Sequence, residues 1–363
     1  MSGRRSTSER LEQLRTRVII ERDGTSSSDF PFHNSSRYPD LDPIAEFRKK
    51  LKVKIIRKAQ YDMEFDLIGV NTAIANALRR IMISEVPTMA IEKVYIYDNT
   101  SIIQDEVFAH RLGLIPIKAD PDMFYFKQEN EGPTDMNTIV FKISHECHYN
   151  AKARDDETNP KNLYVGHNLL SASLIWDPKG EQAERFADNP IQSVHDDILI
   201  AQMRPGQRVE LEAHCEKGIG KEHAKWSPVA TASYRLMPEI ILKEEITGDL
   251  ADKFAACFTK GVVEVVQEEV NGEMIKKAKV VNPRIDTVSR EVLRHKEFED
   301  KVQLTRIRDH FIFTVESTGI LDSERIFIDS IHIIQSKCAR LLLALENKLR
   351  PPDKDENMMS VDT

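Results

Sequence analysis

A helix that must end at a proline, followed at once by an alternating strand, is the feature that most constrains the fold of this chain. Asn71 is a good N-cap, because its side chain can accept hydrogen bonds from the free amides of a first helical turn. Ile74, Leu78 and Ile81 follow at spacings of four and three and form one apolar stripe. Pro87 disfavours the α conformation in the residue before it and ends the helix. The pattern predicts an element that packs one face against another surface, and it contains no catalytic arrangement.

Alternating runs lie on both sides of this helix. Residues 94–97 alternate between aliphatic and aromatic side chains, which predicts a strand. Upstream, the apolar residues of 47–68 also recur at every second position, with a turn near residues 58–60. Two alternating runs joined by a short polar turn predict a β-hairpin that leads into the helix. Strands are also expected at residues 139–143, 172–176, 209–213, 227–242 and 310–317.

The longest periodic segment lies near the C-terminus, over residues 324–349. Its apolar positions recur at spacings of 4, 3, 4, 3 and 4: Phe327, Ile331, Ile334, Cys338, Leu341 and Leu345. Asp322 or Ser323 can cap its start, and Pro351 follows its end. Periodicity alone fits either a helix packed on its own sheet or a helix seam shared with a second polypeptide. The length of the stripe, together with the resemblance below, favours the seam.

Three separated blocks of this sequence resemble one protein family. Residues 71–117 closely resemble the dimerisation signature of the α and α-like subunits of cellular RNA polymerases. Residues 204–240 and 286–319 look like the larger α-like subunit shared by RNA polymerases I and III. The matching blocks together cover most of residues 46–345, so the resemblance is far more specific than one helix–turn match.

The resemblance implies an α+β fold with a discontinuous dimerisation domain, made of a sheet and two long helices. This domain is expected at residues 46–94 and 223–349, with a degenerate ferredoxin-like segment at 250–295. A β-rich domain is inserted at 95–222, where loops rich in proline, aspartate and asparagine separate short strands. Residues 1–45 are expected to form a mostly extended arm that is ordered only where a partner holds it, and residues 350–363 a disordered tail.

The function implied by the resemblance is that of a non-catalytic assembly subunit for rRNA, 5S rRNA and tRNA transcription in the nucleus, including the nucleolus. Its implied partners are the small α-like subunit, the second-largest subunits of polymerases I and III, and the small zinc-binding common subunits. DNA would be contacted only indirectly, and no cofactor is expected. Arg79 and Arg80, outside the first helix stripe, are expected to meet the second-largest subunit. The seam with the small α-like subunit is expected to comprise Phe327, Ile331, Ile334, Cys338, Leu341, Leu345, Ile74, Leu78 and Ile81.

The charge distribution leaves a second function open. The chain of 363 residues carries a formal net charge of −8, which is unusual for a protein that grips duplex DNA through its phosphates. The strongest positive stripe is the basic run at residues 48–58, which is expected to be a solvated strand face. The alternative is a stand-alone nucleic-acid-binding protein that uses this stripe, although interleaved aromatic residues for base stacking are missing.

Metal chemistry is not expected from the cysteines. The four cysteines lie far apart and form no CxxC pair, which is typical of a reducing compartment. On an extended strand His145 and Cys147 face one way and His148 the other, and no second ligand pair follows at zinc-site spacing. The counterpart of this family in polymerase II has a cysteine-rich zinc loop that this chain lacks. Some archaeal relatives carry an iron–sulfur domain near residues 250–294, but only Cys257 lies there, and a cluster needs four thiolates.

Three further patterns are interpreted as structural. Gly218 and Gly220 do not fit the spacing of a phosphate-binding loop and are expected to make a tight chain crossing between domains. Four loop aspartates are expected to be solvated rather than to bind Mg²⁺: Asp120, Asp122, Asp155 and Asp156. The N-terminus lacks the apolar region of a signal peptide, and no apolar run reaches membrane-spanning length. An intracellular, soluble protein without a membrane partner is therefore expected.

Overall fold

The structure of the chain, a computed structural model, describes residues 16–25, 43–154, 157–270 and 273–349. These residues form helices and β-sheets together, so the expected mixed fold class is confirmed at this level. The described residues divide into two compact units. The first draws on residues up to 58, 64–76 and 233–314, and the second on 59–63, 77–232 and those from 315 onward.

The first unit is built on a sheet of strand order β1-β17-β3-β2, in which β14 also pairs with β17. The bounds of these strands are β1 Arg17–Ile20, β2 Lys52–Lys58, β3 Asp62–Ile68, β14 Val229–Leu242 and β17 Val302–Ser317. β1 lies antiparallel to β17, with Arg17 opposite Ile307. The expectation that residues 1–45 are ordered only by a partner is therefore wrong for residues 17–20, because the chain's own sheet holds them. Helix α2, Pro43–Lys50, begins before residue 46, and residues 1–15 and 26–42 lie outside the described residues.

The predicted hairpin is confirmed as β2 and β3, but residues 47–50 belong to helix α2, and only β3 buries a face. Met63, Phe65 and Leu67 of β3 are buried, and the Phe65 ring stacks on Phe313 of β17 with 5.1 Å between ring centroids. Every residue of β2, by contrast, is exposed. Alternation in the sequence therefore identifies both strands but does not predict which of them contributes to the core.

Residues 249–298 of the first unit form a helix and a two-stranded hairpin around an apolar cluster that also includes Ile20 of β1 and Leu304 of β17. The elements are α7 Asp249–Ala256, β15 Val263–Val270 and β16 Glu273–Val280. Phe254 of α7 packs against Phe298, with 5.4 Å between ring centroids, and Cys257 belongs to the same cluster. A ferredoxin-like ancestry of this segment remains a proposal.

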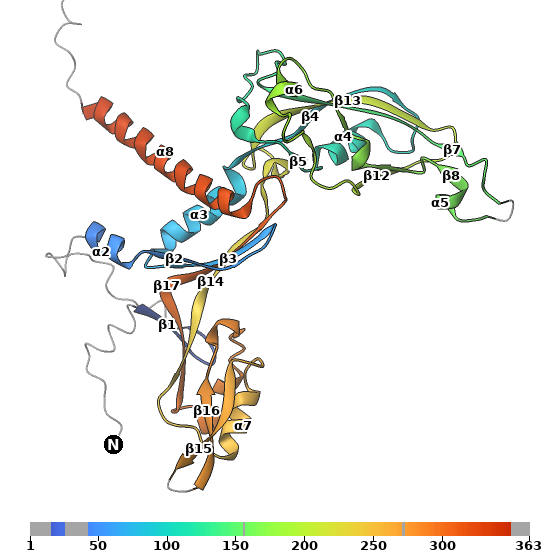
Figure 1. Cartoon of the computed structure of the whole chain (residues 1–363). Coiled ribbons are helices and arrows are strands. Elements are labelled where there is room, and N and C mark those ends of the chain that lie inside the picture. Colours follow the sequence, from blue (N-terminus) through green and yellow to red (C-terminus); the bar gives the residue numbers. More distant parts are fainter. Residues whose placement is uncertain (1–15, 26–42, 155–156, 271–272, 350–363) are drawn as a thin grey trace, which may run out of the picture. The chain divides into compact units, whose positions relative to one another are not determined.

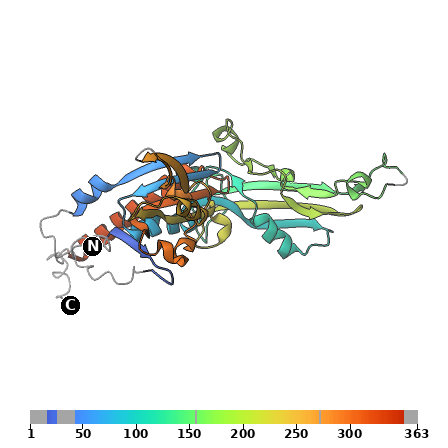
Figure 2. The same ribbon diagram turned by 90° about the horizontal axis from the view of Figure 1, so that it is seen from below.

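The second unit is organised around a four-stranded antiparallel sheet of order β10-β6-β13-β4. Its strands are β4 Pro87–Asn99, β6 Thr138–Glu146, β10 Ile175–Trp176 and β13 Arg208–Ile219. β13 lies beside β4 in both views of the molecule (Figures 1 and 2), with Ala213 opposite Val94 on one side and Phe141 on the other. The strand β4 is continuous across the boundary expected between residues 94 and 95.

Short elements complete the second unit. They are α4 Asp105–Gly113, α5 Pro160–Leu163, α6 Gln182–Arg185, β5 Ile117–Lys118, β7 His148–Tyr149, β8 Tyr164–Val165, β9 Asn168–Leu170, β11 Gln192–Ser193 and β12 Leu199–Gln202. The strand expected at 172–176 is wrong in its first half, because Ser171–Ser173 form a 3₁₀ turn that Leu174 N closes on Ser171 O at 3.0 Å.

The two expected long helices are confirmed as α3, Thr72–Ser84, and α8, Ser323–Leu349. Asn71 caps α3 as predicted, because its Oδ1 accepts a hydrogen bond from Ala73 N at 2.8 Å. The predicted start of α8 differs from the observed one by a single residue. The expected disordered tail, 350–363, lies outside the described residues.

Candidate interaction surface

The first turns of α8 are held firmly by the second unit. Ser323 Oγ donates a hydrogen bond to Tyr61 O at 2.7 Å, and the side chains of Ile326 and Phe327 are buried. Ser330 is also buried and donates to Phe327 O. The helix is thus fixed at its N-terminal end by apolar packing together with a hydrogen bond to the backbone.

Charged groups add a second attachment at the same end. Arg325 Nη2 lies 2.7 Å from Asp120 Oδ1 and 2.7 Å from Asp122 Oδ2, and Arg325 Nε lies 3.6 Å from Asp329 one turn further along α8. Burial alone would raise the pKa of Asp120, but the hydrogen bonds from Arg325 and from the Asp122 backbone outweigh it and hold that pKa below 3.8. Lys217 Nζ of β13 donates to Pro121 O at 2.7 Å and to Phe124 O at 3.0 Å.

Asp120 and Asp122 are solvated loop acids as expected, with side chains 44% and 70% exposed, but both also bind an arginine about two hundred positions away, which was not predicted. Asp120 also caps the 3₁₀ turn Pro121–Met123, accepting from Asp122 N at 3.1 Å. The Asp–Pro dipeptide in the sequence is a signal for such a turn. No local pattern identifies the distant arginine. Asp155 and Asp156 lie outside the described residues.

The C-terminal part of α8, the red helix in Figure 1, is uncovered. Lys337 makes an ion pair with Glu85, and every side chain from residue 338 to 348 is exposed. Leu341 is 65% and Leu345 55% exposed, and the two leucines between residues 341 and 344 are similarly open. Contiguous exposed leucines on one helix mark a surface that a further apolar partner covers.

The predicted seam therefore separates into a buried part and an open part. Phe327 is buried and Ile334 is half-buried, whereas the remaining α8 residues of the seam are exposed: Ile331, Cys338, Leu341 and Leu345. A partner would meet this open part, while Phe327 anchors the helix to its own chain.

The stripe of α3 separates in the same way. Leu78 and Ile81 are buried in the chain, whereas Ile74 is 41% exposed. Assigning Leu78 and Ile81 to a partner surface is not supported by their position, because their side chains already lie in the core. Arg80 is exposed, and Arg79 is half-buried and makes interactions of its own.

Close packing in this unit explains the glycines at 218 and 220. A Cβ added to Gly218 would collide with the indole of Trp226, and one added to Gly220 would collide with the Ile83 carbonyl. Trp226 Nε1 donates to Glu216 O at 3.0 Å, which holds the ring over the strand. The predicted tight crossing is present, but it lies within the second unit rather than between domains.

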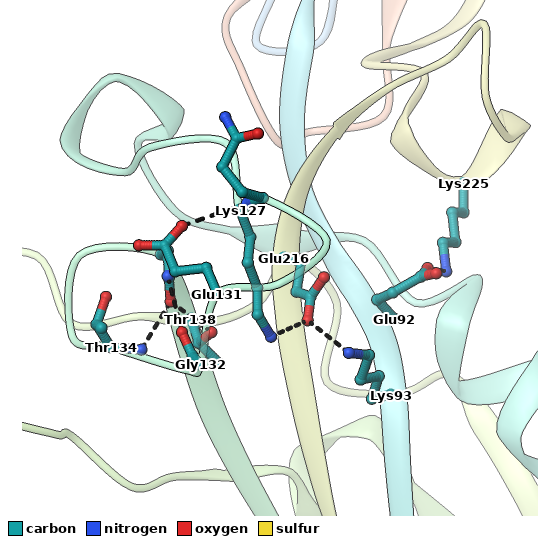
Figure 3. A network of polar contacts seen from close by, with 11 residues as sticks. Glu92, Lys93, Lys127, Glu131, Gly132, Thr134, Thr138, Glu216 and Lys225 are labelled. Carbon is teal, nitrogen blue, oxygen red and sulfur yellow. Dashed lines mark hydrogen bonds and ion pairs between the residues drawn. The ribbon is translucent and has the colours of Figure 1, made fainter.

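A mostly buried ion-pair network joins β13 to its neighbours (Figure 3). Glu216 accepts from Lys127 Nζ at 2.7 Å and lies 3.7 Å from Lys93 Nζ, and the side chains of both Glu216 and Lys127 are mostly buried. Beside it, Lys225 binds Glu92 and donates to Ile91 O at 2.9 Å. Each of these charges has an opposite charge nearby, so none is a free reactive group, and removing one partner would leave the other without its counter-charge.

Three buried thiols of the described residues are poor nucleophiles. Burial raises the pKa of the Cys147, Cys215 and Cys257 thiols, which disfavours the nucleophilic thiolate. His145 pairs with the Gly166 carbonyl at 2.9 Å. Across the described ranges no group of three or more His, Cys, Asp or Glu side chains could hold a metal ion. Among these residues, none of the helices is both long enough and apolar enough to cross a bilayer.

Comparisons with known proteins agree on one family. The model of the RNA polymerase Rpb3/Rpb11 dimerisation domain matches residues 64–338. The chain is 48% identical over 340 residues to DNA-directed RNA polymerases I and III subunit RPAC1 of Bos taurus, covering 93% of this chain and 97% of that protein. It is 46% identical over 321 residues to the Saccharomyces cerevisiae protein of the same description, covering 87% and 94%. Identity to the DNA-directed RNA polymerase II subunit rpb3 of Dictyostelium discoideum is 31% over 305 residues, covering 81% and 94%.

Proposed function

The chain belongs to the family of the RNA polymerase Rpb3/Rpb11 dimerisation domain, and from this premise we propose that it is a non-catalytic assembly subunit shared by RNA polymerases I and III. The chain is more similar in sequence to relatives described as subunits of polymerases I and III than to the polymerase II subunit, and this difference supports the choice. The sequence offers no candidate pair of nucleophile and base, which is consistent with a subunit whose active site lies on other chains.

The observation that carries the proposal is the uncovered apolar face of α8. Its N-terminal turns are fixed by Ile326 and Phe327, while Leu341 and Leu345 meet solvent further along the same helix. A partner helix with its own apolar stripe can cover these leucines in the manner of a helix seam. We assign this partner to the small α-like subunit, with Ile331, Cys338 and the exposed Ile74 as further contacts.

A second docking surface is proposed at the outer side of α3. Arg80 is exposed there, and a carboxylate on the second-largest subunit could bind its guanidinium with two parallel hydrogen bonds. Arg79 lies beside it in sequence and belongs to the same proposal. Small zinc-binding common subunits would join the same assembly, and the complex would act in the nucleus, including the nucleolus, with DNA contacted through other subunits.

The proposal is tested by the composition of what co-purifies with a tagged full-length chain from nuclear extract. Mass spectrometry should find one second α-like chain together with the largest and second-largest subunits of both polymerases I and III. Recovery of the chain with nucleic acid alone would favour the alternative, a stand-alone nucleic-acid-binding protein. Recovery with polymerase II subunits alone would contradict the assignment to polymerases I and III.

A further inference from the structure

The outermost strand of the first unit's sheet is entirely open. β2 is the end strand of the order β1-β17-β3-β2, and all seven of its residues are exposed. An end strand carries a row of backbone N–H and C=O groups on the side that faces no neighbour. A further extended polypeptide can pair with such a row by main-chain hydrogen bonds.

The apolar content of β2 distinguishes it from an ordinary solvated strand. Val53 and Ile55 are both 52% exposed, and Ile56 is 41% exposed. Because successive side chains of a strand point to opposite faces, Ile55 and Ile56 leave apolar surface open on both faces of the sheet edge. An added strand would cover part of these side chains on each face, which a ligand confined to one face could not do.

Two lysines of β2 lack an acidic counterpart among the described residues. Lys52 and Lys54 make no ion pair with any residue in the described part of the chain. The neighbouring strand β3 carries Glu64 and Asp66, but both carboxylates bind Arg284, at 2.5 and 2.7 Å. His310 also lies 3.2 Å from Asp66. Glu64 and Asp66 of the adjacent strand are therefore already committed to other cations.

A comparable basic strand of the same unit shows what balances such charges. β16 carries Lys276 and Lys277 and pairs with the acidic strand β15, with Lys277 opposite Val266 and 3.1 Å from Glu268. Lys276 binds Asp252 of α7 at 2.6 Å. Basic strand β16 is thus paired with an acidic, β-branched strand, whereas no strand of the described residues pairs with the outer side of β2.

We propose that β2 is a docking edge for an extended, acidic, β-branched segment of another polypeptide, which adds to the sheet beside it. Backbone hydrogen bonds would hold the segment, its carboxylates would lie near Lys52 and Lys54, and its apolar side chains would cover Val53, Ile55 and Ile56. β2 belongs to the first unit and the leucine face of α8 to the second, so the two proposed surfaces consist of different residues.

The same charges argue against a second copy of this chain as the occupant. Two β2 edges brought together would place lysines opposite lysines, which is destabilising in a sheet. Lysines on an edge strand are a common means of preventing self-association. An acidic strand escapes this repulsion and is attracted instead, so the edge selects its partner by charge.

Binding is tested with a fluorescently labelled peptide of sequence VEVVQEEV, which is the sequence of Val263–Val270. The peptide is added to the full-length chain after light scattering has shown that the sample is monodisperse. Fluorescence anisotropy should show saturable binding, and the variant Lys52→Glu/Lys54→Glu should bind about tenfold or more weakly. The control variant Lys118→Glu/Lys161→Glu carries the same charge change at two exposed positions of the second unit and should bind as the unaltered chain does.

Hydrogen exchange distinguishes strand addition from loose charge attraction. Saturating peptide should slow amide exchange in residues 52–58, because their outward N–H groups become hydrogen-bonded. Equal binding of a peptide with lysine in place of each glutamate would overturn the proposal. So would binding without protection of these amides, or tighter binding of a single-stranded oligonucleotide that also depends on Lys52 and Lys54. Concentration-dependent dimers that the peptide does not dissociate would indicate that a second copy of this chain occupies the edge instead.

Discussion

Shortening two leucines of α8 should weaken subunit pairing without weakening the fold. Leu→Ala removes three carbons, worth about 2.4 kcal/mol when they are fully buried, at about 0.8 kcal/mol each. Leu341 is 65% and Leu345 55% exposed, so a partner that covers them completely would gain about 1.6 and about 1.3 kcal/mol from these carbons. The double variant Leu341→Ala/Leu345→Ala should therefore bind the small α-like subunit roughly a hundredfold more weakly.

The assay is a titration of the labelled small α-like subunit with the full-length chain, accompanied by a thermal unfolding curve of each variant. The midpoint of unfolding of the double variant should stay within about 2 °C of the unaltered chain, because exposed side chains contribute little to its stability. Ile326→Ala is the matched control, since Ile326 is buried in the same helix and its truncation should lower the unfolding midpoint clearly. Less than a threefold change in affinity for the double variant, or a loss of stability like that of the control, would refute the reasoning.

Three further outcomes are expected. Arg325→Ala should lower the free energy of unfolding by about 1 kcal/mol after allowing for partial exposure. Because the folded-state pKa of Asp120 lies below 3.8, this contribution should be present above pH 3.8 and fade as the pH falls below it. Urea unfolding at pH 7 and pH 3 would detect the difference. Gly218→Ala should destabilise the second unit by about 1–3 kcal/mol, because the added methyl group collides with Trp226. The effect should be visible as a shift in Trp fluorescence and a lower unfolding midpoint, and an unchanged midpoint would contradict the close packing. Arg80→Glu should leave pairing with the small α-like subunit intact but prevent recruitment of the second-largest subunit, and a complete polymerase at normal yield would show that Arg80 is only a solvated charge.

Local signals in the sequence account for much of the fold. The period of α8 and the cap candidates Asp322 and Ser323 locate the helix to within one residue, because a long stripe with a polar start and a following proline leaves few alternatives. Asn71 and Pro87 bracket α3 in the same way. These elements are determined by interactions between residues a few positions apart, which is why a single sequence is enough to find them.

Interactions between distant residues could not be predicted. Arg325 and Asp120 are far apart in the chain, and nothing near either residue identifies the other. The exposure of β2 depends on its place at the end of a sheet whose strand order is set by long-range pairing. The open part of the α8 stripe likewise depends on where the rest of the second unit ends, since Phe327 and Leu341 belong to one periodic pattern but differ completely in burial.

The central claim is that the exposed leucines of α8 are covered by a second α-like chain in the assembled enzyme. A photo-crosslinking amino acid placed at Leu342, which is exposed between the two leucines of the double variant, tests it most directly in polymerase purified from cells. The account predicts crosslinked peptides from the same small α-like subunit in both polymerase I and polymerase III. Crosslinks only within this chain, or no protein crosslink at this position in either enzyme, would contradict it.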